Sequence, residues 1–462
     1  MMKPQQIIEK VLAAADYEDC IVIVNEDTSA NLRWANNTLT TNGVLANRSV
    51  TVIAFVATPD GIASGSITRT DVAESEVAEV AAAAKLAALA AGAAEDAAPL
   101  LTNEVAGDWE SAHQPTGPEV FAKVAPDLGQ MFNRASKDGI ELFGYAEHVH
   151  SSSWIGSKGG IRVRQDQPSG RVEMTGKSHN RTRSTWEGRA TRDFSDLDMH
   201  EIDAAISKRL EWQAKKIDLP AGKYDAVLPA GAVGDLVTYM VWSAAGKDAF
   251  QGQSVFSDKK GGTRVGEKFS NVNLNLFSDP NYPGLGSATH IETTASSPFV
   301  SVFDNGYPVN RFDFMKNGVL TNLINTRASA KEMNTEFVPI SLSDNIIMSV
   351  DGASSSEAEL IKSVKRGLLI TCLWYIRMVD PVSLLLTGLT RDGVYLIENG
   401  EVVGAVNNFR WNESPVELLG RIAAATPTSI TQVREWADYI DRTAMPSVLF
   451  KDFNMSTVSQ AS

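Results

Sequence analysis

The sequence predicts an α+β fold: an N-terminal α/β domain with an antiparallel meander and long helices, then a larger, mainly antiparallel and barrel-like β domain. The 462 residues are enough for two or three domains. Helical spacing of apolar residues is frequent in the first part, whereas short alternating runs separated by Gly, Asn and Asp turns dominate the second. We therefore expect one domain over residues 1–217 and another over residues 218–462.

The first domain is expected to open with a helix over residues 6–15, because Ile7, Ile8, Val11 and Leu12 fall on one stripe. A meander should follow, since runs rich in β-branched residues alternate with polar stretches that are typical of turns. The predicted strands cover residues 20–24, 30–35, 49–56 and 61–68, and the predicted turns cover 25–29 and 46–48.

A second helix is predicted over residues 72–92, where alanine is abundant and Asp71 with Glu74 resembles a capping box. Residues 93–117 lack periodicity and are expected to form an exposed connection. The rest of the domain is predicted to hold helices over 118–137 and 198–216, a strand over 140–146, and a hairpin over 160–174 that turns at Gln167-Pro-Ser-Gly.

The second domain is expected to begin with a strand over residues 224–229 and a helix over 232–245. Asn399-Gly400 lies between two alternating apolar runs in residues 393–406, which is the strongest short-range signal for a hairpin. The other predicted elements are short strands up to about residue 350, an apolar strand over 367–376, a helix over 414–425 and a last strand over 447–450.

Composition excludes several classes of protein. The net charge of −14 argues against a general nucleic-acid binder, because phosphate binding requires a basic surface. The sequence has neither an export signal nor a run of about 20 apolar residues, so we expect a cytoplasmic protein without membrane contact. Two cysteines, Cys20 and Cys372, cannot form a disulfide scaffold and are predicted to be buried free thiols.

The histidines do not form a recognisable metal motif. His200-Glu201 could begin a helical zinc motif, but Ala204 and Ala205 stand where a second histidine is needed. His148 and His150 would share one face of a strand, with Glu147 on the other, and His290-Ile-Glu292 repeats that geometry. We predict no metal site, while a site assembled from His148, His150 and Glu292 remains an alternative.

Other catalytic signatures are also missing. No nucleophile elbow or phosphate loop is present, and Gly284-Leu-Gly286 lacks the third glycine of a dinucleotide motif. A basic stretch over residues 177–192 is either a solvated loop or a grip for a peptide carboxylate or an acidic partner surface. Its cations are Lys177, Arg181, Arg183, Arg189 and Arg192.

Four segments, in order, resemble the TldD/PmbA family, whose members are also called modulators of DNA gyrase. The first is Tyr224-Asp-Ala-Val-Leu-Pro-Ala-Gly-Ala-Val-Gly-Asp-Leu. The others are Phe277-Ser-Asp-Pro, Asn317-Gly-Val-Leu-Thr-Asn-Leu, and the block from Gly367 through Tyr395-Leu-Ile-Glu-Asn-Gly-Glu-Val. With the N-terminal helix and meander, the resemblance covers nearly the whole chain.

The resemblance implies a two-domain fold and a heterodimeric zinc protease that cleaves unfolded peptides inside an enclosed chamber. TldD-type members carry His-Glu-x-x-x-His on the helix after the Val-Leu-Pro-like strand, and a cysteine near the C-terminus. Here Thr238, Tyr239 and Ser243 stand at those helix positions, and Ala444-Met-Pro-Ser-Val-Leu-Phe has no cysteine. The chain is therefore similar to the TldE/PmbA class, which lacks these ligands.

The expected role is a non-catalytic subunit that completes the substrate chamber, with no cofactor of its own and zinc on a TldD-like partner. Thr238, Tyr239 and Trp242 are the candidate substrate-binding residues, either as an aromatic wall along an extended peptide or as plain core packing. Two alternatives remain: a partner-independent homodimer that binds peptides or acts as a scaffold, and an independent hydrolase.

Overall fold

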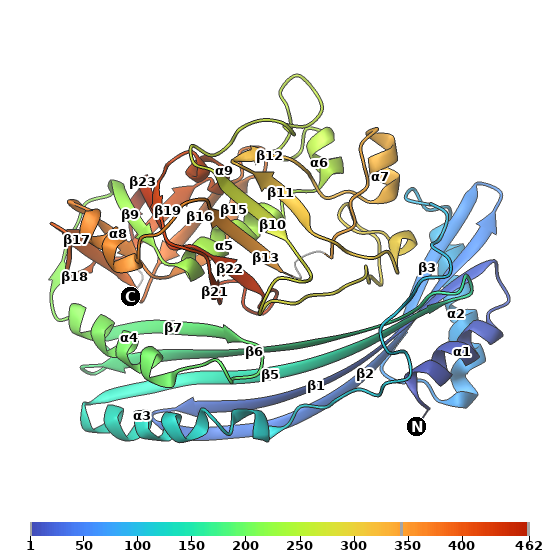
Figure 1. Ribbon diagram of the computed structural model, residues 1–462, viewed down its shortest axis with the longest axis horizontal. Helices are drawn as coiled ribbons and strands as arrows, with labels where there is room; N and C mark the ends of the chain where they lie inside the picture. Colours follow the sequence, from blue (N-terminus) through green and yellow to red (C-terminus); the bar gives the residue numbers. More distant parts are fainter. Residues whose placement is uncertain (1, 342–344, 460–462) are drawn as a thin grey trace.

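A long curled sheet and a β-rich body that rests in its concave side make up the molecule (Figure 1). The computed structural model describes residues 2–341 and 345–459. Within them the strands form sheets of seven, six and ten strands, and helices lie on the outside of the first sheet. The predicted α+β class is confirmed.

The curled sheet is built from seven strands in the order β3-β2-β1-β5-β6-β4, with β7 on the free side of β6. All pairs are antiparallel except β4 with β6. The strands are β1 (Asp19–Ala35), β2 (Thr38–Thr58), β3 (Gly61–Arg69), β4 (Val105–Ala106), β5 (Ile140–Ser157), β6 (Arg162–Ser178) and β7 (Arg183–Thr191).

Three of the turns predicted from composition lie inside these long strands. Residues 25–29 continue β1, residues 46–48 continue β2, and the Gln167-Pro-Ser-Gly segment continues β6. The chain turns instead at Asn36-Asn37 and around Asn180, where left-handed backbone angles favour asparagine. Long-range pairing with the neighbouring strands overrides local turn preference there, because polar residues are tolerated where the sheet faces the hollow.

The two faces of the sheet have different partners. The convex face is covered by α1 (Pro4–Ala14), α2 (Val77–Ala91), α3 (Ala125–Lys137) and α4 (Met199–Trp212). At one end of the concave face, Ile21 and Phe55 pack against Phe303 of the body. Further along, the concave face of β1 is polar and carries Asn25, Asp27, Ser29 and Asn31.

The helices predicted in this half are confirmed with changed ends. The helix predicted over 72–92 is divided into a short 3-10 turn, Glu74–Glu76, and α2. Asp71 accepts from the neighbouring Val72 N–H and from Arg48 of β2 and does not cap the helix. The helix predicted over 118–137 likewise starts with a 3-10 turn, Pro118–Phe121. The connection over 93–117 has little regular structure, and His113 in it hydrogen-bonds to the sheet.

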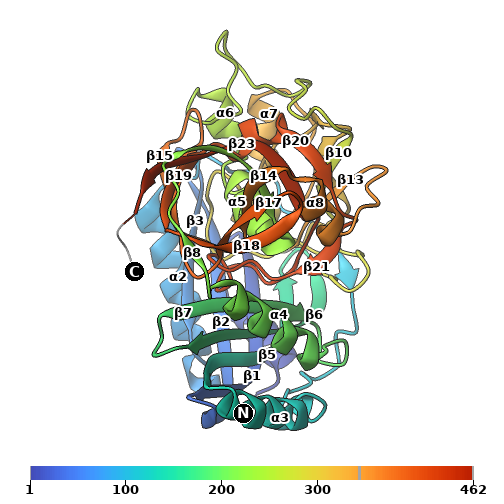
Figure 2. The same ribbon diagram turned by 90° about the vertical axis from the view of Figure 1, so that its left-hand side faces the viewer.

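The body contains a ten-stranded sheet that curls around the helix α5 (Figure 2). Its strands are β8 (Lys216–Ile217), β9 (Gly222–Leu228), β14 (Arg366–Ile370), β15 (Leu373–Asp380), β16 (Leu385–Thr390), β17 (Val394–Glu398), β18 (Glu401–Val406), β19 (Phe409–Glu413), β20 (Ile422–Ala425) and β23 (Val448–Val458). The β17–β18 hairpin turns at Asn399-Gly400, as predicted.

The second sheet of the body has six short strands in the order β12-β11-β10-β13-β22-β21. They are β10 (Leu274–Ser278), β11 (Phe312–Lys316), β12 (Val319–Leu320), β13 (Ile346–Val350), β21 (Ser429–Thr431) and β22 (Thr443–Met445). The remaining helices of the body are α5 (Ala230–Val241), α6 (Gly246–Phe250), α7 (Arg327–Glu332), α8 (Glu357–Ser363) and α9 (Pro415–Leu419).

Two predictions for the body were wrong. The apolar run over 367–376 is two strands, β14 and β15, because the chain leaves the sheet at Thr371-Cys372. The segment over 414–425 is the short helix α9 followed by β20, since Gly420 ends the helix. Cys20 and Cys372 are both buried free cysteines, as predicted.

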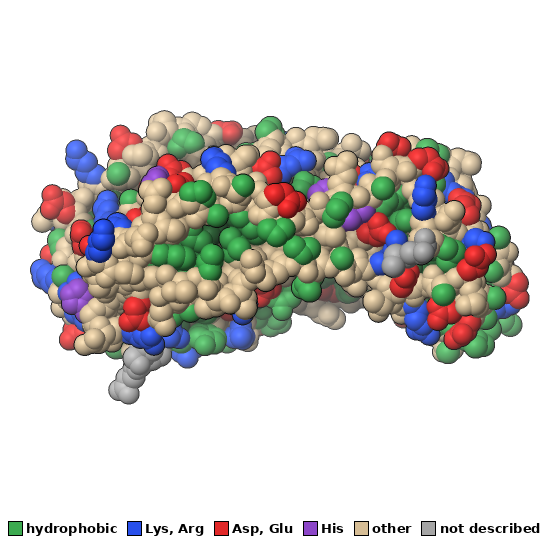
Figure 3. Space-filling view, turned by 90° about the horizontal axis from the view of Figure 1, so that it is seen from below, with side chains coloured by type: hydrophobic (Ala, Val, Ile, Leu, Met, Phe, Trp, Pro, Cys, Tyr) green, Lys and Arg blue, Asp and Glu red, His purple; other side chains and the backbone are tan. Residues whose placement is uncertain are grey.

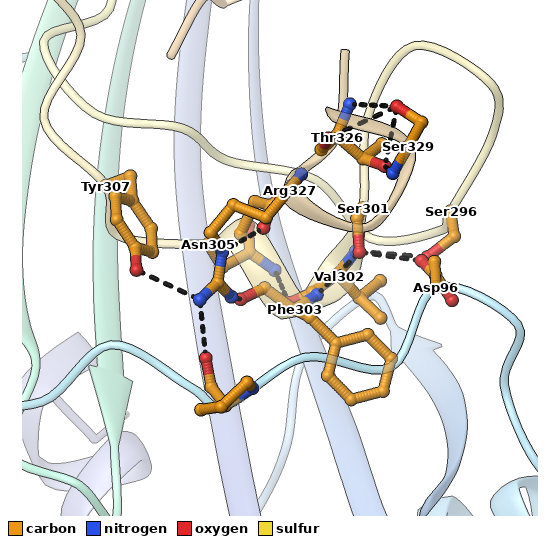
Figure 4. Close-up of polar contacts among 12 residues, drawn as sticks. Asp96, Ser296, Ser301, Val302, Phe303, Asn305, Tyr307, Thr326, Arg327 and Ser329 are labelled. Atoms are coloured by element: carbon orange, nitrogen blue, oxygen red, sulfur yellow. Dashed lines mark hydrogen bonds and ion pairs between the residues drawn. The ribbon is translucent and has the colours of Figure 1, made fainter. Parts of the chain in front are cut away.

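A polar junction ties the body to the connection that follows α2. Arg327 donates to the Asp304 carboxylate at 2.6 Å and to the carbonyl oxygen of Pro99 at 2.7 Å. Beside it, Ser301 donates to Asp96 at 2.6 Å (Figure 4). The bonds to Pro99 and Asp96 join residues more than 200 positions apart, so they tie the body to the connection between α2 and β4.

Apolar and charged side chains are distributed unevenly over the underside of the molecule. Seen from below, apolar side chains gather along the middle of the half that carries α3, and charged side chains surround them (Figure 3). No helix in the described residues is long and apolar enough to cross a membrane.

Candidate functional site

The helix α5 carries the candidate residues and is almost entirely enclosed by the body. Thr238 is 0% exposed, and its Oγ1 has no hydrogen-bond partner among the described residues. Tyr239 and Trp242, at and just beyond the end of the helix, are only half-buried. A ligand could therefore reach Tyr239 and Trp242 but not Thr238 in this conformation, and the assignment of all three to substrate binding stays a prediction.

Tyr239 and Trp242 belong to an aromatic cluster that the sequence did not reveal. Trp436 lies 5.4 Å from Tyr239 and 5.1 Å from Trp242, measured between ring centroids, in edge-to-face orientations. Tyr439 lies 5.9 Å from Trp242 and is largely exposed. The cluster forms because the segment 432–441 crosses the end of α5, and edge-to-face pairs are the favoured arrangement of such rings.

A buried carboxyl group fixes that segment to the helix. Asp235 Oδ1 accepts the backbone N–H groups of Arg434 at 3.1 Å and Glu435 at 2.9 Å, and the Asp235 carbonyl accepts Trp436 Nε1–H at 2.9 Å. Burial raises the pKa of Asp235 to about 8. An aspartate in an otherwise apolar helix is the one signal in the sequence from which this anchor was detectable.

Glu435, the neighbour of Arg434, links this segment to an irregular part of strand β15. Its Oε1 accepts the backbone N–H of Ile376 at 3.0 Å, where β15 shifts register against β16. Tyr375 in this bulge has φ 51°, a left-handed conformation that costs a bulky residue of the order of 1–3 kcal/mol. The bulge presents Trp374 towards the curled sheet.

A cleft of about 530 Å³ opens between the concave face and the body, and we call it the sheet–body cleft. Arg171 occupies its floor and ion-pairs with Asp438 at 2.9 Å and Glu147 at 3.5 Å, with Glu173 at 4.0 Å. From the body, Trp374, Arg434 and Asp438 face it. The remaining lining comes from the sheet and includes Arg33, Phe143, Tyr145, Met174 and Trp186.

Comparison with known proteins places this architecture in a family. A family model described as the PmbA/TldA metallopeptidase C-terminal domain matches residues 221–457, more than half of the chain. The chain belongs to the PmbA/TldD family. The predicted resemblance is thereby confirmed. No curated protein matches the chain.

Solved structures of PmbA/TldD-like proteins share the whole fold. TldE from Thermococcus kodakarensis has a TM-score of 0.76 and 15% identity, covering 97% of this chain and 99% of that one. A protein described as a candidate modulator of a DNA gyrase from Thermotoga maritima has a TM-score of 0.74, 17% identity, and coverage of 97% and 99%. A protein from Bacteroides thetaiotaomicron, also described as a candidate modulator of DNA gyrase, has a TM-score of 0.75, 15% identity, and coverage of 98% of each chain.

The metallopeptidase description implies a metal, but the side chains of α5 do not fit one. Ser243 Oγ donates to the Tyr239 carbonyl at 3.0 Å, and the Thr238 hydroxyl is buried without a partner. Hydroxyl groups are poor zinc ligands, and burial, which raises the pKa of Asp235, disfavours the ionised carboxylate that a metal ion needs. Over residues 2–341 and 345–459, no group of three His, Cys, Asp or Glu side chains is placed to hold an ion.

The alternative set of His148, His150 and Glu292 is not brought together. Both histidines are on the convex side of β5, where His148 hydrogen-bonds to Thr116 and to the Arg192 carbonyl. Glu292 instead accepts from Gln165, whose register places it on the concave face. His290 and Glu104 are separately paired at 3.4 Å.

The basic stretch over 177–192 is the β6–β7 hairpin rather than a solvated loop. Two of its five cations form ion pairs: Arg181 with Glu141, and Arg189 with Glu187. Glu187 also binds Arg209 of α4. The stretch therefore holds α4 against the sheet, and the cleft is lined by other arginines.

Proposed function

We propose that this chain is a TldE/PmbA-like subunit of a TldD/TldE-type zinc metalloprotease that processes unfolded peptides. In this assignment it does not carry the catalytic zinc and completes the substrate chamber. The observation that carries the proposal is the composition of α5, which stands at the family's ligand-bearing position and offers only hydroxyl, aromatic and apolar groups there besides the anchored Asp235.

The concave face supports an extended peptide as the ligand. Its polar centre on β1 continues into the sheet–body cleft, where aromatic and charged side chains alternate. An unfolded chain exposes both backbone amides and apolar side chains, so a surface with polar groups and rings matches both. The half-buried rings of Tyr239 and Trp242 would then contact the peptide beside the cleft.

An unpaired strand edge supports a protein partner. β3 covers β2 only from Val50 to Thr58, so the outer edge of β2 over residues 38–49 has no strand beside it within the described residues. Leu39, Val44 and Leu45 are exposed there. Since an uncovered edge of this length is a template for another strand, we propose that a TldD-like subunit pairs with it and closes the chamber.

Reconstitution tests the proposal. The purified chain is assayed for bound zinc and for cleavage of a casein-derived unfolded peptide, alone and with a TldD-like protein. We expect no stoichiometric zinc and no cleavage by the chain alone, and cleavage when both proteins are present. Zinc binding together with cleavage by the chain alone would refute the assignment.

The partner-independent homodimer is the second candidate, because the β2 edge would equally accept a second copy of this chain. Size-exclusion chromatography with light scattering separates the two. A stable self-dimer that does not exchange with a TldD-like protein favours the homodimer, whereas a 1:1 heterodimer favours the protease subunit.

A further inference from the structure

Arg434 faces the sheet–body cleft in an unusual setting. Its guanidinium carbon lies 3.3 Å from the ring centroid of Trp374 and 5.1 Å from that of Trp186. Its Nε and Nη1 atoms are buried and have no hydrogen-bond partner among the described residues. A cation that contacts two indole rings through its faces is held in orientation, and the Nε and Nη1 N–H groups on its edge are left without an acceptor.

The acidic groups of the cleft do not neutralise Arg434. Glu147, Glu173 and Asp438 all contact Arg171. None of the described carboxylates lies within ion-pair distance of Arg434. The nearby Cys372 thiol interacts with Arg434 and the Asp235 carboxyl lies close enough to feel its charge, and burial raises the pKa of both groups, which favours their neutral forms. Because a partly buried charge without a counter-ion is costly, the site favours an incoming anion.

The positions of Arg434 and Trp374 are fixed by two linked sets of hydrogen bonds. Asp235 holds the backbone N–H groups of Arg434 and Glu435. Glu435 in turn binds the bulge of β15, in which the left-handed Tyr375 places Trp374 over the guanidinium. Strained bulges next to a cleft occur preferentially at binding sites, because they aim a side chain that a regular strand would turn away.

We propose that Arg434, clamped between Trp186 and Trp374, is a binding subsite for a carboxylate group of the extended peptide. The planar guanidinium matches a carboxylate through two parallel N–H···O bonds, and the surrounding rings lower the local dielectric and strengthen them. This subsite rests on the proposed peptide-binding function and specifies which group of the peptide is recognised. The carboxylate is the C-terminus of the peptide or an acidic side chain.

Isothermal titration calorimetry with four probes distinguishes these sources. They are acetyl-Ala-Ala-Ala-Leu as the free acid, the same peptide as its amide, acetyl-Ala-Glu-Ala-Leu-amide, and acetyl-leucine as a minimal carboxylate. If the C-terminus is recognised, the free acid is expected to bind at least about tenfold more tightly than its amide. If an acidic side chain is recognised, the glutamate peptide shows that gain over the amide.

Arg434→Gln and Arg434→Lys test the residue, and Arg410→Gln, which replaces an exposed arginine on β19, is the control. We expect Arg434→Gln to abolish the preference for a carboxylate and Arg434→Lys to retain part of it, since lysine keeps the charge but not the fork. Circular dichroism and thermal melts verify that each variant is folded. Arg410→Gln should bind as the wild type does.

The outcomes separate the two proposals. Equal binding of acid, amide and glutamate peptides, or a preference that survives in folded Arg434→Gln and Arg434→Lys, overturns the subsite and leaves peptide binding standing. Binding of acetyl-leucine through Arg434 without binding of any peptide supports the subsite and contradicts the peptide-processing role. Absence of binding by all four probes overturns both.

Discussion

The carboxyl group of Asp235 accepts the backbone N–H of Glu435 at 2.9 Å, across 200 positions of sequence. Through this bond α5 positions the segment that carries Arg434, Trp436 and Asp438 at the sheet–body cleft. The helix α5 thus holds the wall of the cleft in place. The Asp235 carboxyl is therefore a positioning group, and its ionisation affects the stability of the fold.

The first prediction concerns the pH dependence of stability. The pKa of Asp235 is about 8 in the folded chain and near 3.8 when unfolded, so the unfolded state binds fewer protons between these values. Asp235 therefore causes stability to fall as pH rises, by at most about 1.4 kcal/mol per pH unit. Relative to Asp235→Asn, the wild type should lose stability between pH 5 and pH 8.

Urea unfolding at pH 5, 6, 7 and 8 measures this difference. Asp60→Asn, at an exposed position between β2 and β3, is the matched control and should give a curve parallel to the wild type. If the Asp235→Asn curve is also parallel to the wild type, the carboxyl group is not protonated in the folded chain.

The second prediction concerns the β2 edge. Leu45 is 68% exposed on the unpaired edge and Leu86 is 67% exposed on α2. Leu45→Lys should weaken association with a TldD-like partner by tenfold or more, of the order of 1.4 kcal/mol, because a lysine on a pairing edge opposes strand addition. Leu86→Lys should leave association unchanged, as measured by light scattering over a dilution series. Equal effects of the two variants would place the interface elsewhere.

The third prediction concerns the junction around Arg327. Removing this side chain by Arg327→Ala leaves the buried Asp304 unpaired, so we expect a loss of about 3–5 kcal/mol in the free energy of unfolding. Arg366→Ala, which removes an exposed arginine 3.9 Å from Glu398, should cost less than about 1 kcal/mol. Chemical denaturation of both variants provides the comparison, and similar small losses would mean that the junction contributes little.

The fourth prediction separates the three candidate residues of α5. Thr238→Val removes a buried hydroxyl without a partner, so stability should be unchanged or rise by up to about 1 kcal/mol, and peptide affinity should not change. Trp242→Ala removes a half-buried ring from the aromatic cluster and should lower peptide affinity. Titration of both variants with one peptide tests this; a loss of affinity in Thr238→Val would show that the helix opens to ligand.

The sequence predicted correctly those turns and helices whose conformation depends mainly on neighbouring residues. The Asn399-Gly400 turn and the apolar stripe of the first helix are confirmed, because backbone conformation and spacing are decided within a few residues. The strands β1, β2 and β6 were instead cut into pieces at Asn-, Ser- and Pro-containing segments. Asn25, Asp27 and Ser169 of those segments lie on the concave face, and Pro168, opposite His150, lies on the convex face. The polar hollow that the concave residues face exists only once the sheet has curled, so no local pattern indicates that these strands continue.

The sheet–body cleft was not predicted from the sequence either, because its residues come from distant segments. Trp186, Trp374 and Arg434 come together from β7, β15 and the segment before β22, and nothing in their immediate sequence links them. The resemblance directed attention to α5, whose Thr238 is buried, whereas the groups that face the cleft are anchored to α5 through Asp235. Only Asp235, a charged residue within an apolar helix, could have pointed to this arrangement, and the sequence analysis did not single it out.

The central claim of the proposed function is that this chain does not hold the hydrolytic metal. Metal analysis of the purified TldD/TldE-type pair, and of each protein alone, tests it most directly when combined with a peptide-cleavage assay. The account predicts one zinc per pair, retained by the TldD-like protein alone and absent from this chain. One zinc per molecule in this chain alone, lost together with its own cleavage activity on chelation, would contradict it.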